Sequence, residues 1–170
     1  DAKDIVSMVQ ADKDVIAGIY PKKRMNWGRL EMAVKAGVPT EQLQYHTGDL
    51  VVNLMDYELE REVKATDPVE VWGAGTGFML IKREVFEAMA PTLPSYLNNV
   101  FDMKNPQNGE WVVEFFATLI EKETNLLLSE DYYFCWKARE HGINIWAAPW
   151  VHLGHFGSYL FEGGLLRNEQ

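Results

Sequence analysis

The sequence is organised around the segment LLLSEDYYFCWKAREHG, which runs from Leu126 to Gly142. Ser129 is a residue type favoured at helix N-caps, and two carboxylates follow it in the first turn, where the helix dipole favours negative charge. Glycine, here Gly142, is the residue type that most often follows the C-terminus of a helix. The segment therefore predicts a helix that begins after Ser129 and ends before Gly142.

Asp131 heads one face of this predicted helix. Phe134, Cys135 and Ala138 follow it at helical spacing, so all four side chains share that face, while Glu130 lies on another. Because the other three are apolar, the face should point into the protein. An inward carboxylate at a helix N-terminus is hydrogen-bonded, ionised and held still, which suits a general base or a ligand-orienting group. The alternative is that the two acids only complement the helix dipole.

Composition places the chain among globular proteins. Its 170 residues fit one domain, 1–170, and 47% apolar with 24% charged residues are globular values. A net charge of −9 argues against a nucleic-acid partner, because such proteins need a basic patch. No apolar run approaches the roughly 18 residues that span a bilayer, and we recognise no signal peptide. The single cysteine cannot form an intrachain disulfide, and we expect a cytoplasmic protein.

The first part of the chain predicts a helix, a buried strand and a basic loop. A capping-box pattern at Asp1 precedes an amphipathic helix over residues 2–11. Residues 15–20 are nearly all apolar, as in a strand buried on both faces of an α/β sheet. The loop at residues 21–24 then lies at the C-terminal edge of that strand, where open α/β sheets bind ligands. Lys22 in this loop is either a phosphate contact or an ordinary solvated lysine.

Three alternating glycines, Gly73, Gly75 and Gly77, lie between two predicted strands at residues 69–72 and 78–81. Glycines let a ligand approach the backbone closely. A phosphate-binding glycine fingerprint follows a strand and opens a helix, whereas these glycines precede a strand, so a dinucleotide fold or a P-loop is not expected. The segment is therefore either a backbone shelf for a flat polar ligand such as a sugar, or a bend between strands.

The rest of the chain predicts further helices and strands. The expected elements are helices over 29–36 and 82–89, a helical turn over 40–46, strands over 50–54, 111–116 and 143–148, and loops over 56–64 and 91–110. The second of these loops is long enough to be a functional lid.

The tail segment HLGHFG, residues 152–157, contains two histidines. In an extended chain these two side chains point to opposite faces, so His152 and His155 cannot serve the same site. His155 lies between two glycines, which leave its ring accessible to a metal ion or a phosphate. One imidazole with carboxylates suits Mn²⁺ or Mg²⁺ better than a structural zinc, for which cysteines are missing. The alternative is a hydrogen-bonded core histidine.

Four segments occur in a fixed order: DVIAGIYPKK (14–23), GAGTGFMLIKR (73–83), SEDYYFC (129–135) and LGHFG (153–157). Together they resemble the later part of a nucleotide-sugar-dependent glycosyltransferase of the GT-A fold, of the broad family-two type. The resemblance covers most of the chain, with residues 56–64 and 91–110 poorly matched. It implies an α/β fold with a mixed, mostly parallel sheet flanked by helices, as in the C-terminal part of a Rossmann-like GT-A domain.

The resemblance also implies a reaction, in which an acceptor hydroxyl attacks the anomeric carbon of a nucleotide sugar. Glu130 and Asp131 match the acidic pair near the acceptor, and Asp131 would be the general base of an inverting transfer. His155 matches a late histidine that binds the metal ion or the diphosphate in some members. Mn²⁺ or Mg²⁺ would neutralise the leaving diphosphate. The partners would be a nucleotide-sugar donor and a glycan or another hydroxyl-bearing acceptor.

Other positions match the parts of the family that contact the substrates. The expected substrate-binding residues are Lys22, Trp72, Gly75, Thr76 and Gly77. Lys22 would lie near the phosphates, and the glycine segment would lie against the donor sugar or the acceptor. Trp72 or Trp111 would stack on a sugar ring.

The chain departs from the family on the donor side. The family's Asp-x-Asp metal motif ends a strand just before a helix like residues 2–11, and we expect the chain to lack this motif altogether. The earlier βαβ units that hold the nucleotide base are also missing. The chain therefore resembles the C-terminal portion of a longer, truncated or split enzyme. The alternative function is a non-catalytic carbohydrate-binding or interaction module, and apolar surface left bare by the missing half predicts self-association.

Overall fold

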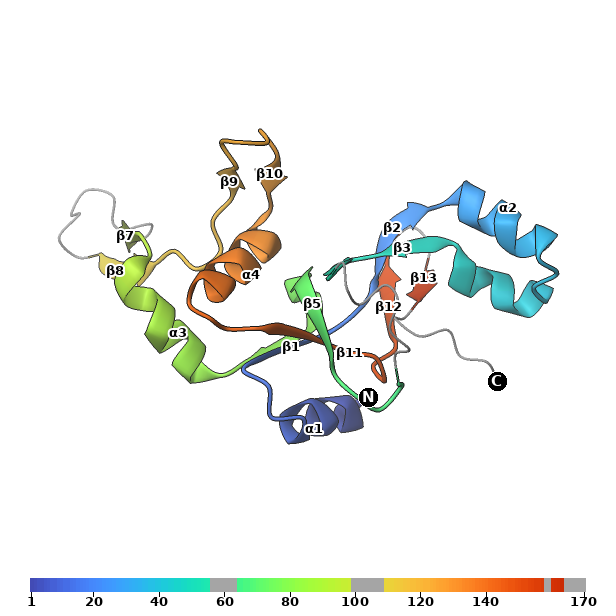
Figure 1. The fold of residues 1–170 in the computed structure, drawn as a ribbon, viewed down its shortest axis with the longest axis horizontal. Helices are drawn as coiled ribbons and strands as arrows, with labels where there is room; N and C mark the ends of the chain where they lie inside the picture. Colours follow the sequence, from blue (N-terminus) through green and yellow to red (C-terminus); the bar gives the residue numbers. More distant parts are fainter. Residues whose placement is uncertain (56–63, 99–108, 158–159, 164–170) are drawn as a thin grey trace.

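The computed structural model describes residues 1–55, 64–98, 109–157 and 160–163, and Figure 1 shows the fold. Among these residues, a five-stranded sheet in the order β4-β5-β11-β1-β6 forms the centre. Its strands are β1 (Val15–Gly18), β4 (Val52–Leu54), β5 (Val69–Ala74), β6 (Met79–Ile81) and β11 (Ile145–Ala148). The helices are α1 (Ala2–Gln10), α2 (Trp27–Lys35), α3 (Arg83–Met89) and α4 (Glu130–Glu140). The prediction of an α/β fold with a mixed sheet and flanking helices is confirmed.

Strand direction differs from the prediction. β1 and β11 are parallel, with Val15 opposite Ile145. The pairs β1–β6, β5–β11 and β4–β5 are antiparallel, so the prediction of a mostly parallel sheet is wrong. An apolar run such as residues 15–20 indicates burial on both faces of a sheet, and burial does not depend on the direction of the neighbouring strand.

The sheet separates two groups of buried side chains. On one face, Val15 and Ala17 pack in a cluster with residues of α3 and α4. On the other face, Ile16 packs with Met8 of α1. Successive side chains of a strand point to opposite faces, so the apolar run of β1 serves both clusters. Every residue of β1 is buried, which makes this strand a fixed base for Tyr20, two residues beyond its end.

Two-stranded ribbons and short 3₁₀ turns surround this centre. The ribbons are β2 (Pro21–Met25) with β3 (Gly48–Leu50), β7 (Ser95–Asn98) with β8 (Glu110–Val113), β9 (Leu119–Ile120) with β10 (Leu127–Leu128), and β12 (Leu153–Phe156) with β13 (Leu160–Gly163). The 3₁₀ turns are Thr40–His46, Thr76–Phe78 and Ala90–Thr92. In Figure 1, the β9–β10 ribbon projects beside α4, and the β2–β3 ribbon lies near β12 and β13.

These ribbons correct several sequence expectations. The basic segment 21–24 is a strand rather than a loop, because proline is tolerated at the first position of a strand and lysines are common on exposed strands. The expected strand 50–54 is divided between β3 and β4. The expected loop 91–110 contains β7, and its residues 99–108 lie outside the described part, as do residues 56–63 of the other expected loop.

The ends of the helices follow the sequence signals in part. Asp1 caps α1 through the predicted capping box, and Gly142 follows α4 with a φ of 75°, a conformation that favours glycine. Ser129 occupies the N-cap position of α4, but its side chain makes no capping hydrogen bond. No helix in the described ranges is long and apolar enough to cross a membrane.

Candidate functional site

Tyr20 forms the centre of the candidate site. Its hydroxyl oxygen accepts a hydrogen bond from the Gly77 amide at 3.2 Å, and its carbonyl accepts one from the Val51 amide at 2.9 Å. A Cβ atom at Gly75 would lie 2.2 Å from the Tyr20 hydroxyl oxygen, and one at Gly77 would lie 2.8 Å from its Cζ atom. Glycine is required at both positions because the Tyr20 ring fills the adjacent space. The expected contact of this segment with a sugar stays a prediction.

Asp131 lies in the first turn of α4, where Thr76 holds its carboxylate. The predicted inward face is confirmed, since Phe134, Cys135 and Ala138 are fully buried. The Thr76 hydroxyl donates a hydrogen bond to Oδ1 of Asp131. No other hydrogen bond reaches this carboxylate from the residues that the structure describes, so Oδ2 keeps its lone pairs for a ligand. A half-buried carboxylate with one oxygen held and one oxygen available has the geometry of a general base.

The charges of Glu130 and Asp131 also affect the pKa of the Tyr20 hydroxyl. Burial raises the pKa of Tyr20 above its usual 10.0, the Gly77 amide opposes this shift, and the charges of Asp131 and Glu130 add to it. The hydroxyl is therefore protonated at neutral pH and can donate its hydrogen to a ligand. The Glu130 side chain is exposed and forms no hydrogen bond or ion pair with another described residue.

His155 lies on β12 and contacts Tyr20 and the residue after it. Its Nδ1 atom is 2.9 Å from the Pro21 carbonyl oxygen. A carbonyl only accepts, so Nδ1 carries the hydrogen and Nε2 is left as the acceptor of the neutral ring. The imidazole meets the Tyr20 ring edge to face, with centroids 5.4 Å apart and planes at 82°. His152, as expected, does not share this position, and it is exposed.

The described residues do not fit a metal ion. Within residues 1–55, 64–98, 109–157 and 160–163, no three His, Cys, Asp or Glu side chains converge where they could hold one. His155 therefore offers a single nitrogen, without the carboxylates that Mn²⁺ or Mg²⁺ prefers. The expected metal stays a prediction, and no step of the chemistry below depends on it.

An Asp-x-Asp triplet does occur at Asp12-Lys13-Asp14, after α1 rather than before it. The expectation that the chain lacks this spacing altogether was wrong. Both carboxylates bind the Lys82 ammonium, at 2.8 Å from Asp12 and 3.1 Å from Asp14. The hydrogen bond and charge of Lys82 lower the pKa of Asp12. The triplet precedes β1, at the end of the strand opposite Tyr20, and its charge is already neutralised.

Trp72 pairs with a tyrosine that flanks the acidic pair. The rings of Trp72 and Tyr132 are 6.2 Å apart and tilted by 30°. A Cβ atom at Gly73 would lie 2.9 Å from the Tyr132 ring, so this glycine allows the close approach of β5 to α4. Burial first, then the charges of Cys135, Asp131 and Tyr20, raise the pKa of Tyr132 to about 12. The aromatic pair is thus part of the same neighbourhood as Asp131.

Lys22 and Trp111 are more exposed than the other expected substrate contacts. Lys22 lies on β2, next to the Pro21 carbonyl that binds His155, and has no ion-pair partner in the described ranges. Trp111 lies on β8 with 72% of its surface exposed. Lys22 is therefore adjacent to the site in sequence, whereas no contact joins Trp111 to Tyr20 or Asp131 among the residues described.

Sequence reasoning did not identify Tyr20 or Arg139. Arg139, in the last turn of α4, donates to the Trp72 carbonyl at 2.9 Å and to the Val71 carbonyl, and forms an ion pair with Glu70 at 3.3 Å. These bonds fix α4 against β5 and so fix the position of Asp131. The place of Tyr20 at the end of a buried strand was a usable signal, whereas the contacts of Arg139 depend on tertiary structure.

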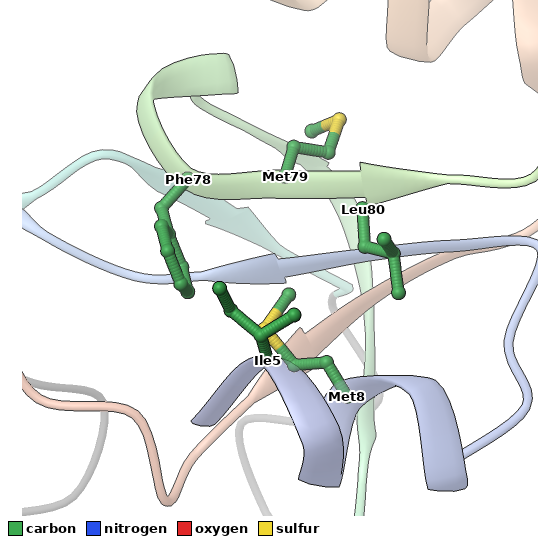
Figure 2. Close-up of a pocket in the computed structure, with 5 residues that line it drawn as sticks. All are labelled: Ile5, Met8, Phe78, Met79 and Leu80. Atoms are coloured by element: carbon green, nitrogen blue, oxygen red, sulfur yellow. The ribbon is translucent and has the colours of Figure 1, made fainter. Parts of the chain in front are cut away.

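A separate apolar pocket of about 150 Å³ lies between α1 and β6. Figure 2 shows Ile5 and Met8 of α1 facing Phe78 and Leu80 across it. None of its lining residues is titratable, so we assign it no chemistry. Phe78 follows the glycine segment, but neither Tyr20, Asp131 nor His155 lines this pocket.

Comparisons with protein-family models, curated proteins and solved structures found no match for this chain. The family resemblance of the four segments therefore stays an expectation. The residues that meet around Tyr20 are the basis of the function proposed below.

Proposed function

We propose that this chain is a nucleotide-sugar-dependent glycosyltransferase of the GT-A type. The observation that carries the proposal is the convergence of four distant sequence segments around Tyr20. Hydrogen bonds join Asp131 to Thr76, and His155 to the residue after Tyr20. These are the segments whose order resembles the family, and a shared site gives that order a physical reason.

In the proposed reaction, an acceptor oxygen bonds to the anomeric carbon while the bond from that carbon to the diphosphate oxygen breaks. Oδ2 of Asp131 takes the proton of the attacking hydroxyl, and attack opposite the leaving group inverts the configuration. Thr76 on the other carboxylate oxygen supports this role by fixing the orientation. Glu130, exposed beside Asp131, is placed to bind acceptor hydroxyls, and Tyr20 supplies a further donor.

The alternative is a non-catalytic carbohydrate-binding module. Two observations favour it: the described residues hold no metal-ligand group, and the Trp72–Tyr132 pair offers an aromatic surface for a sugar. The glycosyltransferase, by contrast, needs residues that bind the diphosphate of the donor, and the proposal assigns this role to Lys22 and His155. The two functions differ in whether Asp131 takes part in chemistry.

Thermal unfolding against UDP-, GDP-, CDP- and dTDP-sugars, each with and without Mn²⁺, tests the proposal. One of the four nucleotide sugars should raise the melting temperature of the chain, because a ligand that binds the folded state stabilises it. The same donor with a panel of glycan acceptors should release nucleoside diphosphate. Asp131→Asn should keep the shift and lose the transfer, whereas Asp67→Asn, at an exposed carboxylate outside the site, should keep both.

The absence of any shift and any transfer with all four donors would contradict the glycosyltransferase proposal. Binding of a glycan without transfer, unchanged in Asp131→Asn, would establish the alternative. Transfer at the wild-type rate by Asp131→Asn would remove Asp131 as the base.

A further inference from the structure

The Asp131 carboxylate depends on one neighbour for its orientation. The Thr76 hydroxyl on Oδ1 is its one hydrogen bond from the described residues. The terminal torsion of an aspartate is broad, so a carboxylate without a donor can rotate between several orientations. A hydroxyl donor on one oxygen selects the orientation in which the other oxygen is presented outward.

Thr76 is itself fixed by the turn that contains it. The Gly75 amide donates to the Val51 carbonyl at 3.3 Å, and the Gly77 amide donates to the Tyr20 hydroxyl at 3.2 Å. The two hydrogen bonds hold the residues on either side of Thr76. The Tyr20 ring also fills the space beside both glycines, so the turn cannot move toward it.

We propose that Thr76 is a positioning residue for the Asp131 base, and that Tyr20 fixes Thr76 by holding the turn around it. This inference rests on the proposed function, in which Asp131 removes the proton of the acceptor. It assigns Thr76 a role different from the substrate contact implied by the family resemblance. The hydroxyl of Thr76 acts through Asp131 and need not touch either substrate.

A matched set of variants separates this role from a structural one. Thr76→Val keeps the shape of the side chain and removes the hydroxyl, whereas Thr76→Ser keeps the hydroxyl. Thr66→Val is the control, because the Thr66 hydroxyl also donates to a carboxylate, Asp67 at 3.0 Å, but on the exposed surface. Tyr20→Phe removes the hydroxyl that accepts from Gly77 and leaves the ring in place.

The measurement is kcat and KM for transfer, or for hydrolysis when water is the acceptor, from UDP-, GDP-, CDP- and dTDP-sugars, with the melting temperature of each variant. Thr76→Val should lower kcat about ten- to a hundred-fold with little change in the KM for the donor, because misplacing a catalytic group acts on the chemical step. Thr76→Ser should recover most of this loss. Tyr20→Phe should lower kcat less than Thr76→Val, and Thr66→Val should leave it unchanged.

Two results would overturn the inference and leave the proposed function standing. One is a wild-type kcat in Thr76→Val. The other is an equal loss in the valine and serine variants together with a lower melting temperature, which would make the role of Thr76 structural. A wild-type chain without transfer or hydrolysis from any donor would overturn both the inference and the proposed function.

Discussion

The Tyr20 ring occupies the space that a side chain at position 75 or 77 would need. We expect Gly75→Ala to lower the free energy of unfolding by about 1–3 kcal/mol, because the new Cβ would lie 2.2 Å from the Tyr20 hydroxyl and 2.8 Å from Val51. Gly28→Ala in α2 is the matched control, since the nearest atom to its Cβ is 3.6 Å away. Alanine is favoured over glycine in a helix, so this control should be neutral or more stable by up to about 1 kcal/mol. Urea denaturation measures both, and equal effects would contradict the packing of Tyr20 on the glycine segment.

Tyr132 links the same site to stability at high pH. Burial raises its pKa from the usual 10.0 to about 12, so the folded state favours the neutral phenol. The stabilisation is complete below pH 10 and is lost as the pH rises toward 12, since the unfolded chain ionises first. Tyr132→Phe should make stability less dependent on pH in this window, measured by urea denaturation at several pH values. Tyr96→Phe, at an exposed position, is the control, and a wild-type profile in Tyr132→Phe would contradict the shift.

At the scale of elements, the sequence predicted a helix or strand correctly where a single residue or one apolar face determines where it begins, ends or packs. The helix after Ser129 was predicted from its acidic first turn, its apolar face and Gly142, and all but the capping hydrogen bond of Ser129 are present. The sequence could not give the strand directions, because an apolar run is the same in parallel and antiparallel neighbours. It also could not give the ribbon that contains Lys22, whose partner strand lies more than twenty residues away.

In the candidate site, too, residues with a local sequence signal were predicted, whereas residues defined by long-range contacts were not. Asp131 and His155 were predicted because each has a local reason, a helix start and a pair of flanking glycines. Thr76 was expected to contact a substrate, and its hydrogen bond to Asp131 was not foreseen. The two residues are 55 positions apart, and sequence spacing carries no information about such a contact. Tyr20 was missed because its partners Val51, Gly77 and His155 lie far from it in the sequence.

At the scale of the whole molecule, α1 carries apolar side chains on its outer face as well as its inner one. Met8 is buried against the sheet, while Val6 and Val9 are 55% and 58% exposed. Large bare apolar surfaces are uncommon in monomers, so we expect the chain to self-associate through this face. The net charge of −9 opposes association, and screening by salt should therefore strengthen it.

Light scattering at increasing salt concentration tests this expectation. Val6→Lys should shift the chain toward the monomer, because a charge on the outer face of α1 would have to be buried at the interface. Gln44→Lys adds the same charge at an exposed polar position in another element and should leave association unchanged. The two variants change the net charge equally, so a difference between them reports the α1 face and not general repulsion. A wild-type chain that stays a monodisperse monomer at high salt would show that the exposed valines of α1 tolerate water, and would contradict the association.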